Sequence, residues 1–184
     1  MEKIRCPWVT SDPLYIKYHD EEWGVPCYKN QQLFEMLCLE GQQAGLSWIT
    51  VLKKRAQYRN LFCSFSPVNI ANLTDEYLEQ VLLNPGIIRN RLKVFGIRKN
   101  AQAYLKIEEV HDSFSNYIWA FVEGKVIKNK FKKSSKIPVE TAVSVNMSKQ
   151  LKKDGFTFVG SKICYAFMQA SGMVNDHNIS CFKR

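Results

Sequence analysis

Two cysteines and two histidines lie near the ends of the sequence, and their residue types suit a metal ion. Cys6 and His19 lie near the start, and His177 and Cys181 lie in the segment DHNISC near the end. The His-x3-Cys spacing places two ligands about one helical turn apart. A closed set of two thiolates and two imidazoles is typical of structural zinc, because it leaves no position for a reacting water. The spacing is also compatible with a coincidence, since the two halves must meet in space.

The segment LCLEGQQAGLSWITVL, residues 37–52, contains a single charged residue, Glu40. No other charged side chain occurs between Glu35 and Lys53. A carboxylate in such surroundings is either a solvated residue at a helix end or a group that binds a cation. The pattern alone does not choose between the two.

Residues 151–172, LKKDGFTFVGSKICYAFMQASG, predict two helices joined by a glycine-bounded turn. The start of the second helix, at Gly160, Ser161 and Lys162, would present free backbone N–H groups that suit a phosphate oxygen. Such contacts hold DNA without reading its sequence. The pattern resembles the helix-hairpin-helix of DNA repair enzymes, with Phe158 in place of the first glycine. An ordinary pair of antiparallel helices explains it equally well.

Helix signals recur along the whole chain and strand signals hardly occur, so we expect an all-α protein. Three dipeptides pair an N-cap residue with a proline at the first helical position, namely Asp12-Pro13, Ser66-Pro67 and Asn84-Pro85. The predicted helices span residues 12–22, 31–40, 46–60, 67–72, 75–83, 85–107, 114–123, 142–153 and 161–171. We expect a single domain over residues 1–184, with two helical lobes around a cleft.

The charge balance favours a polyanionic partner. The chain has 26 Lys and Arg against 17 Asp and Glu, which gives a formal net charge of +9. Nucleic acid is the first candidate and an anionic membrane surface the second. Residues 125–139, KVIKNKFKKSSKIPV, predict an exposed basic loop that is either solvated or in contact with DNA. No apolar run is long enough for a signal peptide or a membrane span, so we expect a soluble, cytoplasmic protein with reduced cysteines.

Four long segments resemble the 3-methyladenine DNA glycosylase I family, in the family's order. They are WVTSDPLYIKYHDEEWGVP (8–26), LFEMLCLEGQQAGLSWITVLKKRAQYR (33–59), NPGIIRNRLKVFGIRKNAQAYL (84–105) and GFTFVGSKICYAFMQASGMVNDH (155–177). The resemblance implies a helix-hairpin-helix glycosylase fold, with the hairpin at about residues 145–172, and excision of N3-methylated adenine from DNA. It also implies a structural zinc ion that joins the termini through Cys6, His19, His177 and Cys181. We therefore expect double-stranded alkylated DNA as the partner, free 3-methyladenine as the product ligand, no membrane partner, and a monomer.

The resemblance assigns Glu40, Tyr18 and Trp48 to the catalytic base pocket. Tyr15, Trp8 and Trp23 are further candidates for its aromatic walls. Alkylation at N3 makes adenine cationic, so electron-rich rings stack well against it. An ionised Glu40 can accept hydrogen bonds from the exocyclic amine, and we expect that no Lys or Arg of the chain pairs with this carboxylate.

The distance between Glu40 and Trp48 requires a break in the helix. In an uninterrupted helix they would lie about 12 Å apart along the axis, so we expect a bend at Gly41 and Gly45. By resemblance, residues 42–46 approach the gap left by the flipped nucleotide, and we expect Leu46 to be the wedge.

The expected reaction is hydrolysis of the N-glycosidic bond through an oxocarbenium-like sugar. Relatives in the superfamily carry an aspartate about twenty residues after the last glycine of the hairpin, where this chain has Ser180, and Asp176 is the nearest aspartate. Lys162 stands where bifunctional members carry a Schiff-base lysine, but without that aspartate we expect a monofunctional enzyme. Two alternatives remain: a zinc-stabilised DNA-binding module without catalysis, and a glycosylase that also removes 7-methylguanine.

Overall fold

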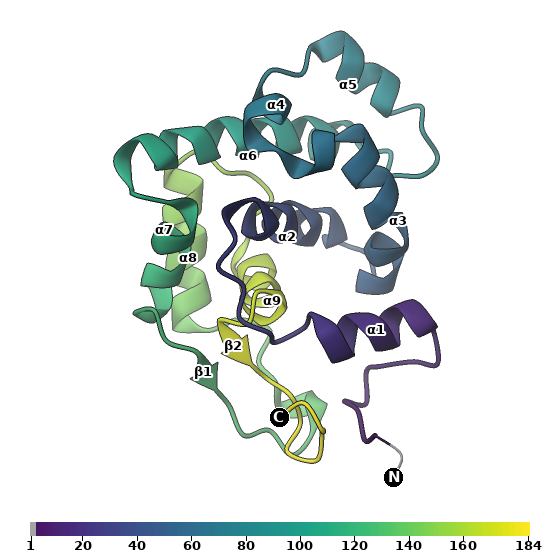
Figure 1. The fold of residues 1–184 in the computed structure, drawn as a ribbon, viewed down its shortest axis with the longest axis vertical. Helices are drawn as coiled ribbons and strands as arrows, with labels where there is room; N and C mark the ends of the chain where they lie inside the picture. The colour runs from purple at the N-terminus through teal and green to yellow at the C-terminus, as the bar shows by residue number, and fades with distance from the viewer. Residues whose placement is uncertain (1–2) are drawn as a thin grey trace.

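Helices form almost all of the regular secondary structure in the computed structural model, which describes residues 3–184 (Figure 1). The α-helices are α1 (Pro13–Glu21), α2 (Asn30–Gln43), α3 (Trp48–Leu61), α4 (Pro67–Ala71), α5 (Asp75–Val81), α6 (Arg91–Val110), α7 (Phe114–Trp119), α8 (Ala142–Lys153) and α9 (Ser161–Ala170). Three short 3-10 helices are η1 (Cys63–Phe65), η2 (Ala120–Val122) and η3 (Ser134–Lys136). The prediction of a mainly helical chain is confirmed. No helix within residues 3–184 is long and apolar enough to cross a membrane.

The expectation of an all-α chain is wrong at one point, because β1 (Ile127–Lys128) pairs in parallel with β2 (Val174–Asn175). The lysine-rich segment that contains β1 is therefore tied to the C-terminal segment. Farther along, the backbone oxygen of Phe131 accepts a hydrogen bond from the backbone N–H of Ile179 at 3.1 Å. This ladder holds the segment that leads into η3 in place.

Proline and N-cap signals located some helix starts correctly and misplaced one. Asp12 caps α1 by accepting a hydrogen bond from the backbone N–H of Leu14, with Pro13 at the first position. The helix predicted at 85–107 instead begins at Arg91, with Asn90 as its N-cap. The side chain of Asn84 accepts from the backbone N–H of Gly86 at 2.7 Å, as a cap would, but side chains of α3 bind the backbone that follows: Tyr58 accepts from the N–H of Ile88 and Lys54 donates to the oxygen of Pro85.

The break between α2 and α3 lies later than the sequence predicts. Gly41 is helical, α2 continues to Gln43, and Ala44 is its C-cap. Gly45 follows with φ of +79°, a left-handed conformation that a glycine adopts without strain. The expected bend is thus confirmed at Gly45 and wrong at Gly41.

Gly41 has a packing role that involves the turn between α8 and α9. A Cβ atom at Gly41 would lie 3.0 Å from the Cβ of Phe158, and one at Gly96 would lie 3.1 Å from its ring. Phe158 has φ of +56°, so the position where the hairpin pattern has a glycine does adopt a left-handed conformation. The two glycines of α2 and α6 make room for this side chain.

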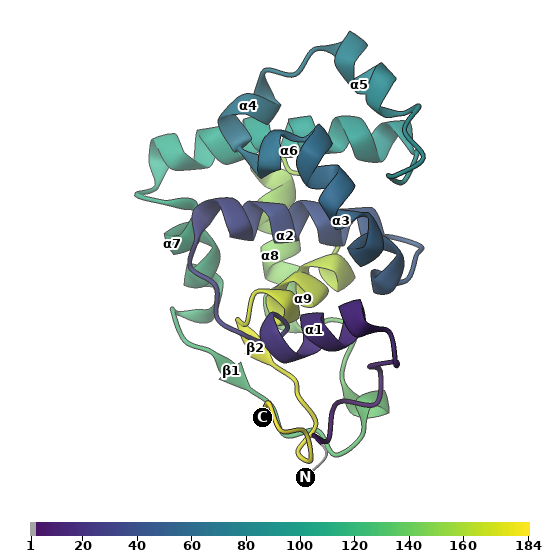
Figure 2. The same ribbon diagram turned by 45° about the vertical axis from the view of Figure 1, so that its right-hand side comes forward.

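The buried core is divided unequally. One large cluster includes buried side chains of α2, α3, α6, α7, α8 and α9. A small second cluster contains Cys6, Tyr18, Trp23, Leu52 and Cys181. In Figures 1 and 2, α2 lies between α6 on one side and α1 with α9 on the other. The segment before α1 contacts the C-terminal segment, since the backbone N–H of Phe182 donates to the oxygen of Ile4 at 3.0 Å. The small cluster therefore joins the N-terminal and C-terminal segments beside α1.

Candidate functional site

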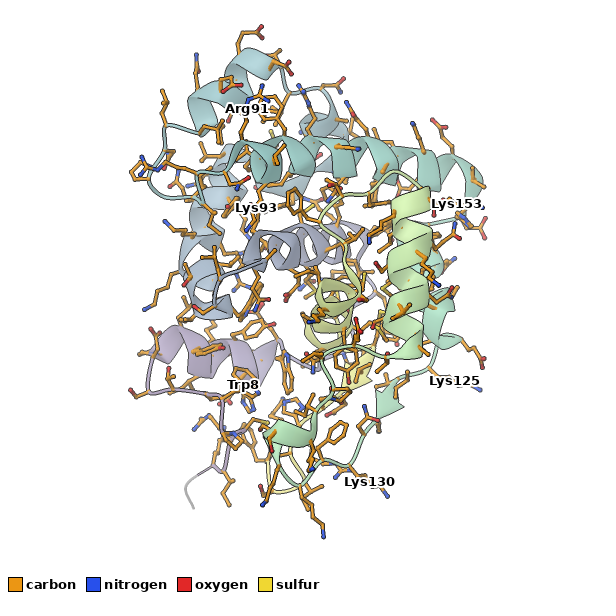
Figure 3. All side chains as sticks on the ribbon, turned by 180° about the vertical axis from the view of Figure 1, so that it is seen from behind. Trp8, Arg91, Lys93, Lys125, Lys130 and Lys153 are labelled. Atoms are coloured by element: carbon orange, nitrogen blue, oxygen red, sulfur yellow. The ribbon has the colours of Figure 1, made fainter. Side chains whose placement is uncertain are left out.

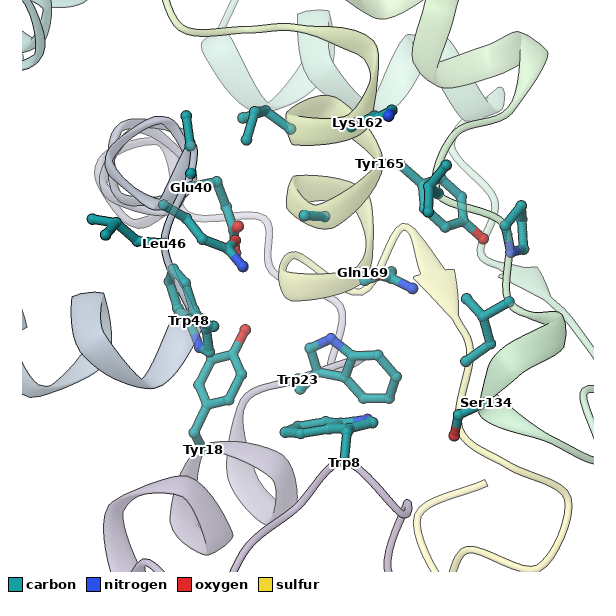
Figure 4. Close-up of a pocket in the computed structure, with 18 of the residues that line it drawn as sticks. Trp8, Tyr18, Trp23, Glu40, Leu46, Trp48, Ser134, Lys162, Tyr165 and Gln169 are labelled. Atoms are coloured by element: carbon teal, nitrogen blue, oxygen red, sulfur yellow. The ribbon is translucent and has the colours of Figure 1, made fainter.

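A pocket of about 620 Å³ opens where α1, the α2–α3 connection, α9 and the segment after η3 meet (Figure 4). All six residues that the sequence assigns to catalysis or to the base pocket line it: Trp8, Tyr15, Tyr18, Trp23, Glu40 and Trp48. Leu46 and Lys162 also line it. The structure thus brings together residues from three separate parts of the sequence.

Glu40 extends from α2 into this pocket (Figure 4) and is only 2% exposed. Its Oε2 atom is buried and has no hydrogen-bond partner among the described residues. None of the ion pairs formed within residues 3–184 involves it, so the expectation of an unpaired carboxylate is confirmed. Burial raises the pKa of Glu40 from 4.5 to about 8, which favours the neutral form in the unliganded protein. Glu40 can therefore act as the ionised acceptor expected from the sequence when a cation occupies the pocket.

Aromatic rings surround Glu40 on the α1 side. The ring centroids of Tyr18 and Trp48 lie 5.3 Å apart, and those of Trp8 and Trp23 lie 5.0 Å apart. Trp8 also contacts Tyr15 at 5.0 Å. These flat, electron-rich faces can bind a planar cation by stacking.

Two tyrosines and one tryptophan add polar atoms to the pocket. The Nε1 atom of Trp48 is buried without a hydrogen-bond partner in the described part of the chain. Burial, followed by the negative charge of Glu40, raises the pKa of both Tyr18 and Tyr15, so both phenols stay neutral donors. The pocket therefore offers one acceptor group and several N–H or O–H donors to a planar ligand.

The opposite wall contains residues that the sequence analysis did not assign to the pocket. These residues are Ser134, Ile137, Pro138, Val139, Ile163, Tyr165, Ala166 and Gln169, whereas the lining residues Gln43, Ala44 and Gly45 belong to the 42–46 segment expected at the flipped nucleotide. Those of α9 follow Lys162 at helical spacing, a signal that could have found them. The segment after η3 reaches the pocket through the strand pairing and contacts with the C-terminal segment, which no local pattern reveals.

The predicted phosphate site at the start of α9 is only partly open. The hydroxyl of Ser161 donates a hydrogen bond to the carboxylate of Glu140. Gly160 is the N-cap of α9 and no side chain caps this end of the helix. Lys162 is exposed at the pocket. The backbone N–H groups and Lys162, rather than the Ser161 hydroxyl, are available to an anion.

Asp176 does not occupy the pocket. It is fully buried and accepts hydrogen bonds from Asn129 at 2.7 Å, Tyr165 at 2.7 Å and Gln169 at 2.8 Å. Two of these donors line the pocket. Asp176 thus orients pocket side chains, and it is not aimed at a sugar.

Three of the four predicted metal ligands form one cluster. The ligand atoms of Cys6, His19 and Cys181 all lie within 4.8 Å of one another, and all three residues are buried. The backbone N–H of Asn178 donates to the sulfur of Cys6 at 3.4 Å. The Nδ1 atom of His19 lies 2.8 Å from the carboxylate of Asp20, which leaves Nε2 for a metal ion.

His177, the fourth predicted ligand, lies beside this cluster. Its ring centroid is 5.0 Å from that of His19, and its Nε2 atom is buried without a hydrogen-bond partner within residues 3–184. Its Nδ1 atom lies 3.0 Å from the side-chain oxygen of Asn175. Gly24 backs the ring closely, since a Cβ there would lie 2.8 Å from the Cε1 atom of His177.

Comparisons with known proteins agree over nearly the whole chain. The family described as methyladenine glycosylase matches residues 8–184. DNA-3-methyladenine glycosylase 1 of Escherichia coli (strain K12) is 52% identical over 177 residues, which is 96% of this chain and 95% of that protein. DNA-3-methyladenine glycosylase of Haemophilus influenzae is 51% identical over 177 residues, 96% of each chain.

The fold agrees equally closely with solved structures. A crystal structure of 3-methyladenine DNA glycosylase I superposes with a TM-score of 0.96 at 54% identity, covering 97% of this chain and 98% of that one. A structure described as showing 3-methyladenine recognition by the Staphylococcus aureus enzyme superposes with a TM-score of 0.94 at 37% identity, covering 97% of this chain and 95% of that one.

Proposed function

The chain belongs to the methyladenine glycosylase family, and we propose that it excises 3-methyladenine from alkylated double-stranded DNA in the cytoplasm. The observation that carries the proposal is the buried, unpaired carboxylate of Glu40 among aromatic rings in a pocket of about 620 Å³. Such a group binds a planar cation better than a neutral base. The relatives are named for the same activity, and one solved relative is described in complex with 3-methyladenine.

The pocket recognises the charge of the damaged base. A base alkylated at N3 is cationic, so it stabilises the ionised form of Glu40 and stacks against the rings of Trp48 and Tyr18. The carboxylate then accepts hydrogen bonds from the exocyclic amine. A neutral adenine gives Glu40 no counter-charge and binds less well, and 7-methylguanine offers a carbonyl where the carboxylate needs a donor.

The same charge weakens the glycosidic bond. The methylated base leaves as a neutral molecule, and water captures the oxocarbenium-like sugar. Asp176 is occupied by three hydrogen bonds, so this chain relies on base binding rather than on an aspartate at the sugar. The reaction is monofunctional, and borohydride should trap no covalent adduct between Lys162 and DNA.

DNA binding combines the net positive charge with the helix-hairpin-helix unit formed by α8, α9 and the turn between them. The uncapped start of α9 at Gly160 and the exposed Lys162 contact phosphates. Leu46, which is 42% exposed at the pocket, fills the space of the extruded base. Extrusion is required because the glycosidic bond is inaccessible within a duplex.

A structural zinc ion fits the cluster beside α1. The ligands are the thiolates of Cys6 and Cys181 and the Nε2 atoms of His19 and His177. The buried, partnerless Nε2 of His177 supports a fourth ligand in addition to the three-residue cluster. A closed set of this kind binds zinc for stability and supplies no reacting water. Its role is to fix α1, and hence Tyr15 and Tyr18, against the C-terminal segment.

The decisive experiment incubates the purified monomeric chain with dimethyl-sulfate-treated DNA and identifies the released bases by chromatography. We expect release of 3-methyladenine and little 7-methylguanine. Glu40→Gln should lower the rate about a hundredfold or more, since it removes the charge that stabilises the cationic base. Glu35→Gln is the matched control, because Glu35 is buried on the same helix but pairs with Arg59 at 2.7 Å. Absence of released 3-methyladenine, or an unaffected Glu40→Gln variant, would contradict the proposal.

A further inference from the structure

Lys93 lies near the start of α6 and is only 7% exposed. No other lysine or arginine within residues 3–184 is as deeply buried. None of the ion pairs formed in the described part of the chain includes it. A buried cation without a carboxylate is costly, so its hydrogen bonds must compensate for lost hydration.

The ammonium of Lys93 donates to the backbone oxygen of Gln42 at 2.9 Å and to that of Ala44 at 2.7 Å. These oxygens belong to the end of α2, where the free carbonyls carry partial negative charge. The last turn of α2 has no basic residue of its own. Lys93 therefore supplies from α6 the cation that stabilises this helix end, and Figure 3 shows it between the two helices.

A second set of hydrogen bonds keeps the two partners in register. The side-chain nitrogen of Gln42 donates to the backbone oxygen of Lys93 at 3.3 Å. The side-chain oxygen of Gln42 accepts from the hydroxyl of Tyr58 at 3.1 Å, and this hydroxyl accepts from the backbone N–H of Ile88 at 3.0 Å. The end of α2 is thus fixed against α3 and against the segment before α6.

The segment that follows is the one that carries Leu46. Ala44 is the C-cap, Gly45 has φ of +79°, and the backbone N–H of Leu46 returns to the oxygen of Gln43 at 2.6 Å. A glycine at this point makes the turn easy to form and also easy to deform. The hydrogen bond from Lys93 to the backbone oxygen of Ala44 ties this turn to α6 two residues before Leu46.

We propose that Lys93 is a positioning residue for base extrusion, which holds the Ala44–Leu46 turn rigid so that Leu46 can enter the duplex. This inference rests on the proposed function. While the base is extruded, Leu46 must hold its position in the duplex against the tendency of the base to stack again. A turn that yields would let the base return before hydrolysis. Lys93 does not line the pocket, so it acts through Leu46 and not on the bound base.

The test compares Lys93→Met, which keeps the length of the side chain but removes the ammonium, with the unaltered chain. Release of 3-methyladenine from dimethyl-sulfate-treated duplex DNA should fall about tenfold to a hundredfold under single-turnover conditions. Affinity for free 3-methyladenine, measured by quenching of tryptophan fluorescence, should stay within about twofold, because extrusion is not needed. Lys106→Met, an exposed lysine on the same helix, is the control and should change neither quantity.

A double-mutant cycle with Leu46→Ala separates positioning from general destabilisation. If Lys93 acts through Leu46, the double variant should be about as slow as Leu46→Ala alone, since the two effects share one cause. Additive losses, or an equal loss of affinity for the free base, would overturn the inference. Should Lys93→Met fail to fold in a thermal scan, Lys93→Gln, which removes the charge and keeps an N–H₂ group on a shorter side chain, replaces it in the same measurements. Lack of release by the unaltered chain would instead refute the proposed function.

Discussion

Two buried carboxylates near the pocket have opposite surroundings. Asp176 accepts three hydrogen bonds, from Asn129, Tyr165 and Gln169, at 2.7 to 2.8 Å. Glu40 is almost as buried, yet its Oε2 has no partner within residues 3–184. The first arrangement recovers the cost of burying a carboxylate, and the second leaves that cost in place.

The difference separates groups that hold the fold from groups that await a ligand. The buried side-chain atoms without a partner in the described residues are Glu40 Oε2, Trp48 Nε1 and His177 Nε2. Two of them belong to residues that line the pocket, and the third lies beside the cysteine–histidine cluster. Unsatisfied buried atoms are rare in native proteins, so their coincidence with the two proposed ligand sites supports both proposals.

Removal of the proposed zinc ion should have the largest effect, because it would break the contacts of all four proposed ligands, which come from both ends of the chain. We expect the chelated protein to lose on the order of 5 kcal/mol of stability, which lowers the melting temperature by roughly 10 to 20 °C for a chain of this size. Elemental analysis should find one zinc ion per chain before chelation. If the melting temperature is the same with and without the chelator, the zinc proposal is wrong, and the missing hydrogen-bond partner of His177 Nε2 has another cause.

Glu40→Gln should stabilise the unliganded protein increasingly as pH rises. The folded pKa of about 8 exceeds the ordinary value of 4.5, so between these values the folded state holds a proton that the unfolded state has lost. Stability of the unaltered protein therefore falls as pH rises through this window, and glutamine removes the fall. The variant should gain up to about 4 kcal/mol between pH 4.5 and 8 relative to the unaltered chain. If the free energies of unfolding of the variant and the unaltered chain, measured with urea, differ by the same amount at every pH in this range, Glu40 is hydrated or paired.

Asp176→Asn should destabilise the folded protein, whereas Glu40→Gln should stabilise it. The substitution places an N–H₂ group or a weaker acceptor among three donors, so at least one buried donor loses its partner. We expect a loss of about 3 kcal/mol at neutral pH, measured by urea unfolding. An Asp176→Asn variant as stable as the unaltered chain would remove the contrast with Glu40.

Local signals in the sequence predict much of the fold, and family resemblance predicts one side of the pocket. The N-cap at Asp12 and the glycine at position 45 act through their own neighbours, so each feature could be located from the sequence. The pocket residues Glu40, Tyr18 and Trp48 were assigned by family resemblance, and the structure places all three in one pocket.

Features that depend on distant contacts were missed. The two-residue strands exist because Ile127 meets Val174 across the fold, and neither segment is long enough to show a strand pattern. The helix predicted from residue 85 begins only at Arg91, and the backbone before it is bound by two side chains of α3, Lys54 at the oxygen of Pro85 and Tyr58 at the N–H of Ile88. The raised pKa of unliganded Glu40 could not be predicted from the sequence, since it depends on burial that only the assembled walls create.

Tyr165→Phe should have the smallest effect. The substitution removes one donor to Asp176, the hydroxyl at 2.7 Å, and leaves the other two in place. A hydrogen bond to a charged acceptor contributes about 1.5 kcal/mol, and no new donor is left unpaired. We therefore expect about half the loss caused by Asp176→Asn, measured under the same conditions. A loss as large as that of Asp176→Asn would show that the Tyr165 bond carries the site alone, whereas no loss would show that Asn129 and Gln169 suffice to hold a buried carboxylate.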